Sequence, residues 1–142
     1  MFRRIDDSIS VASQMTTDQV AAAKADGVTM IINNRPDDEE AGQTNGAEIA
    51  AAAEAAGVAY RAIPVTHAGF SANQLNEMNA ALDAANGPAL AYCRSGTRST
   101  YLWALARAQR GDAPDTLAEK AAGAGYDLSS IRPMLDALSG GR

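Results

Sequence analysis

The sequence has one cysteine, one histidine and few aromatic side chains. A single cysteine cannot form an internal disulfide, so we expect a reducing, cytoplasmic setting. Because aromatic residues make up only 5% of the chain, we expect an aliphatic core. No apolar run approaches the ~20 residues that span a bilayer, and the N-terminal residues 1–4 are not followed by an apolar signal region. We therefore expect no membrane partner.

Basic residues are also in short supply. The chain has 12 Lys and Arg against 17 Asp and Glu, which gives a net charge of −5. This balance argues against a nucleic acid as the partner. The 142 residues contain no internal repeat, linker or low-complexity stretch, so we expect a single domain over residues 1–142.

Strand-like and helix-like segments alternate along the chain. Strands are predicted at 9–13, 28–32, 58–65 and 89–92, and helices at 16–24, 47–56, 71–85, 99–110, 115–122 and 129–138. Such alternation predicts a three-layer α/β/α fold around a mainly parallel sheet of four to five strands. Ligand sites of open α/β sheets gather at the carboxyl ends of the strands. Arg35, the acidic run 37–40 and His67 should therefore lie near Cys93.

The loop after the strand at 89–92 is the most informative segment. Cys93 is followed by small or basic residues (Arg94, Ser95, Gly96, Thr97, Arg98), and a helix then begins. Backbone N–H groups and the positive end of a helix dipole should converge on such a thiol, so we expect it to ionise readily. Ser95, Gly96 and Thr97 would form an anion cradle, and Arg98 offers a planar fork of donors. We expect Ser99 to donate a hydrogen bond to the thiolate.

This loop resembles those of two enzyme families. Tyrosine and dual-specificity phosphatases carry Gly three residues after Cys and Arg six residues after it, whereas rhodanese-type sulfurtransferases use a loop one residue shorter. Arg98 lies five positions after Cys93, as in the shorter loop, and Ser99 stands where a phosphatase would have its arginine. Tyr92 stands where most such phosphatases have histidine.

The rest of the chain looks phosphatase-like. Segments 31–35 and 60–65 resemble dual-specificity phosphatase strands, and from residue 9 to residue 128 the sequence is similar to the phosphatase-like domain of beta-lactamase-hydrolase-like proteins, a bacterial family. The resemblance implies a tyrosine-phosphatase-like fold. Many members are described as sulfur transferases, and some are fused to sulfur-oxidising metallo-hydrolase domains, which implies such an enzyme as a partner.

Two departures from the phosphatase pattern lead to a sulfurtransferase as the main hypothesis. The shorter loop makes a narrower ring, and residues 66–69 contain no carboxylate to serve as a general acid. Cys93 would take sulfur from thiosulfate or a persulfide donor and pass it to a thiol or cyanide, without a cofactor. Arg94, Arg35 and His67 would help to bind the anionic donor.

Other interpretations remain open. A cysteine-dependent phosphatase would use His67 or an acidic-loop residue as proton donor, and a non-catalytic anion-binding module would have an ordinary thiol. Cys93 could also be a small core residue, while Arg98, Arg94, His67 and the acidic run could be solvated or paired, for instance with Arg35. One Cys, one His and adjacent carboxylates do not form a sensible ligand set, so no metal site is expected.

Overall fold

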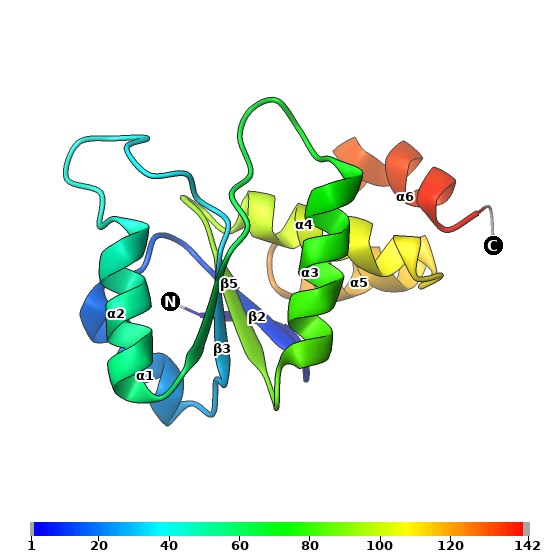
Figure 1. Ribbon diagram of the computed structural model, residues 1–142. Helices are drawn as coiled ribbons and strands as arrows, with labels where there is room; N and C mark the ends of the chain where they lie inside the picture. Colours follow the sequence, from blue (N-terminus) through cyan, green and yellow to red (C-terminus); the bar gives the residue numbers. More distant parts are fainter. Residues whose placement is uncertain (1, 141–142) are drawn as a thin grey trace.

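The computed structural model describes residues 2–140 as a five-stranded sheet with helices on both faces (Figure 1). The strands are β1 (Arg3–Asp6), β2 (Ile9–Ala12), β3 (Met30–Asn33), β4 (Ala59–Ala62) and β5 (Ala89–Tyr92). Their order in the sheet is β1-β2-β5-β3-β4; β1 runs antiparallel to β2, and the other neighbours are parallel. The predicted α/β fold with a mainly parallel sheet is therefore confirmed.

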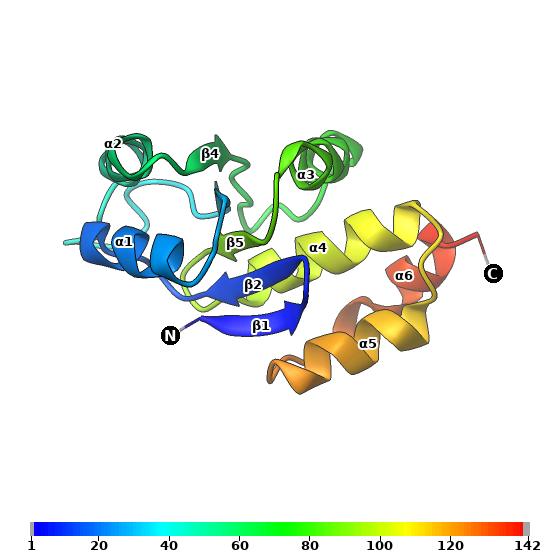
Figure 2. The same ribbon diagram turned by 90° about the horizontal axis from the view of Figure 1, so that it is seen from below.

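The helices form the two outer layers (Figure 2). One face of the sheet carries α1 (Thr17–Ala25) and α2 (Gly46–Ala56); the other carries α3 (Ala72–Ala84), α4 (Thr97–Gln109), α5 (Pro114–Gly123) and α6 (Arg132–Leu138). The central strand β5 contributes to both cores because its side chains alternate between the faces. Ala89 and Ala91 join the core beneath α3 and α4, and Leu90 and Tyr92 join the core beneath α1 and α2.

Local signals placed several helix ends correctly. Thr16 and Ser71, the first residues of two predicted helices, both form capping boxes, in which the glutamine three residues later bonds back to the cap. Helix α2 ends at Gly57 in the left-handed conformation, with φ 75°, which glycine adopts without a Cβ penalty.

Two elements differ from the sequence-based expectation. Strand β1 was not predicted, since Ile5 is its only buried residue and gives almost no periodic signal. The strand expected at 58–65 is regular only over Ala59–Ala62. Beyond it, the amides of Ile63 and Val65 still donate to Asn33 and Asn34 at 2.9 Å, but the intervening Pro64 has no N–H to continue the ladder.

This topology brings four loops to one edge of the sheet. Because β5 lies between β2 and β3, the loop after β5 has the loops that follow β2 and β3 on either side, with the loop after β4 beyond. The cysteine loop sits at the centre of this arrangement and leads directly into α4. Within residues 2–140, no helix combines the length and apolar composition needed to cross a membrane.

Candidate active site

Cys93 lies in the turn between β5 and α4. Helix α4 begins at Thr97, and Gly96 precedes it with φ 91°, a conformation that favours glycine. The backbone N–H of Gly96 donates to Cys93 Sγ at 3.1 Å. The positive end of the α4 dipole therefore lies beside the sulfur, an arrangement that stabilises a thiolate.

The sulfur is covered rather than open to solvent. Cys93 has no exposed surface, whereas a cavity of about 280 Å³ nearby is lined by Glu39, His67, Arg94 and Arg98. The pKa of Arg98 is raised chiefly by its hydrogen bonds to Glu39, and further by the adjacent Cys93 sulfur. Arg98 thus interacts with the buried sulfur and also lines the cavity.

Glu39 forms a two-bond ion pair with the Arg98 guanidinium. Its Oε2 and Oε1 accept hydrogen bonds from Arg98 Nη1 and Nη2 at 2.7 and 2.8 Å, and Nη1 also donates to the Val65 carbonyl at 2.8 Å. These bonds to Arg98, with a further contribution from Arg35, lower the pKa of Glu39 from 4.5 to about 2. Glu39 is consequently a carboxylate at neutral pH and cannot act there as a proton donor.

Arg35 is buried, with only 1% of its side chain exposed, and three of its five N–H donors bond to groups within the protein. Its Nε donates to Glu39 Oε1 at 2.8 Å, Nη1 to Gln14 at 3.0 Å and Nη2 to Glu40 at 3.1 Å. The expectation that Arg35 binds the substrate anion is therefore corrected. Its burial against two carboxylates makes it an anchor for the acidic loop.

Ser99 also departs from the prediction. Its hydroxyl donates to Asn34 Oδ1 at 2.8 Å instead of to the thiolate, and Asn34 in turn donates through Nδ2 to the Ile63 carbonyl at 2.9 Å. All these groups are buried. The reason is positional: Ser99 is the third residue of α4, and Asn34, directly after β3, offers a buried acceptor.

The remaining predicted residues lie around the loop. Arg94 is exposed and approaches Glu40 at 3.8 Å, and the hydroxyls of Ser95 and Thr97 pair with each other at 3.1 Å. In the acidic run, Asp37 accepts from the Gly46 amide at 2.8 Å, away from the cysteine loop. Across residues 2–140, no three Cys, His, Asp or Glu side chains lie close enough together to hold a metal ion.

Sequence reasoning missed several contributors. Gln14 follows β2, so the rule that loops meet at the carboxyl edge could have included it. No local signal in the sequence shows that Asn34 is buried and joins Ser99 to the Ile63 carbonyl, instead of being an ordinary loop residue. Tyr126, whose hydroxyl contacts the cysteine loop, is distant in sequence from every predicted site residue.

Residues 1–110 match the family model described as the phosphatase-like domain of beta-lactamase hydrolase-like proteins. The chain belongs to this family. It is 34% identical over 117 residues to a beta-lactamase hydrolase-like protein of Agrobacterium fabrum, covering 79% of this chain and 27% of the relative. A protein of the same name from Xylella fastidiosa is 34% identical over 101 residues, covering 71% and 23%. The chain thus spans about a quarter of the length of these curated relatives.

Solved structures extend the comparison. A candidate phosphatase from Neisseria meningitidis superposes with a TM-score of 0.84 at 33% identity, covering 96% of both chains. PTPMT1 superposes with a TM-score of 0.75 at 19% identity, covering 99% of this chain and 95% of that one. At such identity the second likeness shows the fold alone, and that fold is the one found in tyrosine-phosphatase-type enzymes.

Proposed function

We propose that this chain is a cysteine-dependent phosphatase in which Cys93 is the nucleophile. The observation that carries the proposal is the position of Arg98, which interacts with the Cys93 sulfur and also lines the cavity, together with Glu39, His67 and Arg94. Family membership and the likeness to a candidate phosphatase favour this alternative over the sulfur-transfer hypothesis.

The hydrogen bonds of Arg98 leave it suited to a phosphoryl group. A guanidinium has five N–H donors. Nη1 uses both of its hydrogens, on Glu39 and on the Val65 carbonyl, and Nη2 uses one on Glu39. The two donors not used on Glu39 or Val65, one on Nη2 and the one on Nε, lie on the same edge of the planar group, and Arg98 also interacts with the Cys93 sulfur. That edge can bind two oxygens of a phosphoryl group side by side.

The chemical steps follow from these groups. The Cys93 thiolate attacks phosphorus and forms a P–S bond, the P–O ester bond breaks, and the leaving oxygen takes a proton. Water then attacks the cysteinyl-phosphate, which releases inorganic phosphate and restores the thiolate. Arg98 stabilises the charge on the equatorial oxygens, and the Gly96 amide stabilises the Cys93 sulfur as the thiolate is restored.

His67 is our candidate for the proton donor. Its side chain is exposed in the wall of the cavity and makes no hydrogen bond to another described residue. The loop that carries it, residues 66–69, contains no carboxylate that could take the same role. Glu39 is excluded by its low pKa. Asp37 is excluded as the proton donor because its carboxylate accepts a hydrogen bond from the Gly46 amide at the start of α2.

Sulfur transfer remains a second candidate because of one specific feature, the five-residue spacing from Cys93 to Arg98. In that reaction Cys93 attacks the outer sulfur of thiosulfate, the S–S bond breaks, and sulfite leaves with the electron pair. A thiol would then take the sulfur from the Cys93 persulfide. This chemistry needs no proton donor at His67.

The test treats the protein in parallel with an aryl phosphate and with thiosulfate, and measures turnover and the mass added to Cys93. The phosphatase proposal expects turnover of the aryl phosphate that Cys93→Ser abolishes without changing Tm. Arg98→Lys should lower that turnover on the order of 10²-fold, because the paired donors are lost. The matched control is Arg107→Lys on the same helix, whose guanidinium pairs with Asp112 at 2.9 Å instead of with the site.

Each outcome is decisive. Addition of one sulfur atom to Cys93, together with aryl phosphate turnover that Arg98→Lys leaves unchanged, would replace the phosphatase proposal with sulfur transfer. If neither reaction occurs, both enzymatic proposals are wrong and the chain is a non-catalytic anion-binding module.

A further inference from the structure

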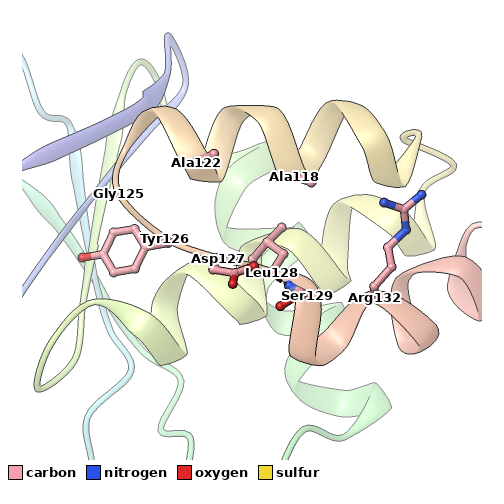
Figure 3. A pocket seen from close by; sticks show the side chains of 8 residues that line it. All are labelled: Ala118, Ala122, Gly125, Tyr126, Asp127, Leu128, Ser129 and Arg132. Carbon is pink, nitrogen blue, oxygen red and sulfur yellow. Dashed lines mark hydrogen bonds between the residues drawn. The ribbon is translucent and has the colours of Figure 1, made fainter.

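We infer that Tyr126 is a positioning residue for Cys93, acting through the peptide bond between Ser95 and Gly96. Tyr126 lies between α5 and α6, beyond the residues 1–110 that match the family model. Its hydroxyl donates to the Ser95 carbonyl at 2.9 Å. Figure 3 shows the ring at one end of a cavity of about 530 Å³, with its oxygen directed away from Arg132 at the other end.

The geometry of one peptide unit links Tyr126 to the sulfur. The carbonyl of Ser95 and the N–H of Gly96 belong to the same planar trans peptide, so they point in opposite directions. Tyr126 holds the carbonyl on one side, and the N–H therefore points to the other, where it donates to Cys93 Sγ at 3.1 Å. Rotation of this peptide would break both hydrogen bonds together.

Close packing keeps the tyrosine against the loop. A Cβ placed on Gly96 would overlap the Tyr126 hydroxyl, so the absence of a side chain at position 96 is what allows this approach. Burial raises the pKa of Tyr126, and the hydroxyl therefore remains protonated and able to donate. The contact is thus a stable donor–acceptor pair on the outer side of the catalytic loop.

The ring itself is fixed from strand β1. The Arg3 guanidinium lies over the Tyr126 ring, 5.6 Å from its centroid, and Arg3 Nη1 donates to the Ala124 carbonyl at 3.1 Å. A Cβ on Gly125 would overlap this guanidinium. The first strand and the C-terminal segment therefore meet at Tyr126 and together brace the cysteine loop.

Removal of the hydroxyl alone tests the inference. Tyr126→Phe keeps the ring and its contact with Arg3 but leaves the Ser95 carbonyl without its donor. The matched control is Tyr101→Phe, which removes a hydroxyl that lies 3.0 Å from Ser130 Oγ and 3.4 Å from the Asp127 carbonyl and makes no bond to the cysteine loop. We would follow the rate of Cys93 alkylation by iodoacetamide against pH, together with Tm, for both variants and the unaltered protein.

We expect Tyr126→Phe to move the midpoint of the alkylation profile upward by at most roughly one pH unit, the contribution of one hydrogen bond to a charged group, because the variant loosens the Gly96 N–H bond to Sγ without removing it. Tyr101→Phe should leave the midpoint in place. The plateau rate at high pH reports access to the buried sulfur, and it should be the same in all three proteins. A midpoint that is unchanged in Tyr126→Phe, or one that moves equally in Tyr101→Phe, would overturn the inference.

The catalytic consequence rests on the proposed phosphatase function. There, Tyr126→Phe should lower kcat for an aryl phosphate by about tenfold with little change in KM, less than the loss caused by removing a direct oxyanion donor. The two proposals fail separately. If Tyr126→Phe shifts the alkylation midpoint as expected but the protein turns over no phosphate ester, only the phosphatase function is contradicted.

Discussion

Arg98 and Glu39 form a two-bond ion pair at 2.7 and 2.8 Å, placed between the acidic loop and the cysteine loop. Glu39 is also bonded to the buried Arg35 at 2.8 Å, so the carboxylate joins two guanidinium groups. These bonds fix the orientation of the Arg98 guanidinium. Under the proposed function, the edge that does not face the carboxylate binds the phosphoryl group.

The Glu39→Gln variant should change how stability depends on pH. The pKa of Glu39 is about 2 in the folded protein and 4.5 unperturbed, so the carboxylate contributes stability that is complete above pH 4.5 and is lost as pH falls toward 2. After a discount for partial solvent exposure, we expect this loss to be about 2 kcal/mol. Urea unfolding between pH 2 and pH 6 should show a shallower acid-side decline in the variant.

The control for this experiment is Asp83→Asn. The pKa of Asp83 is also lowered, chiefly by its hydrogen bonds to Arg110, but that pair is exposed at the surface. Solvent screens such pairs, so the variant should keep the acid-side decline of the unaltered protein. Equal behaviour of the two variants would contradict a special role for Glu39.

His67→Gln should reveal whether His67 protonates the leaving group. A general acid matters most when the leaving oxygen is strongly basic. We therefore expect the variant to lose about 10²-fold in turnover of an alkyl phosphate, while an aryl phosphate with a good leaving group loses only a few-fold. Steady-state rates for the two substrates measure this directly. Equal losses for both substrates would assign His67 to anion binding alone.

Ser99→Ala should act on stability and not on the thiol. The substitution leaves buried Asn34 Oδ1 without its donor, which should cost about 1–3 kcal/mol. Ser95→Ala removes an exposed hydroxyl and should change stability by less than about 0.5 kcal/mol. If the pH profile of Cys93 alkylation shifts in Ser99→Ala, the result would instead support the original prediction that Ser99 bonds to the thiolate.

Local patterns were enough to predict most of the fold. The capping boxes at Thr16 and Ser71 and the stop at Gly57 involve only residues within one helical turn, so they are visible in the sequence. The edge strand β1 was missed because a single buried residue, Ile5, carries no period. Parallel topology also predicted that the loops carrying Arg98, Arg35 and His67 would meet at one edge.

The partners within that edge could not be predicted. Four consecutive carboxylates follow Pro36, and nothing in their composition indicates that Glu39 contacts Arg98 while Asp37 caps α2. That choice depends on the path of the loop, including a left-handed residue at Asp38 with φ 63°. A similar limit applies to Ser99, because its contact is decided by where β3 ends.

The amino-acid sequence by itself determined the order of strands and helices after β1, the cysteine loop and its short spacing to Arg98, because each depends on neighbours along the chain. Only the tertiary structure decided that Glu39 holds Arg98 and that Tyr126 braces the Ser95–Gly96 peptide. These contacts join residues separated by 59 and 31 positions. Such pairs follow from the packing of the whole domain, which no local pattern encodes.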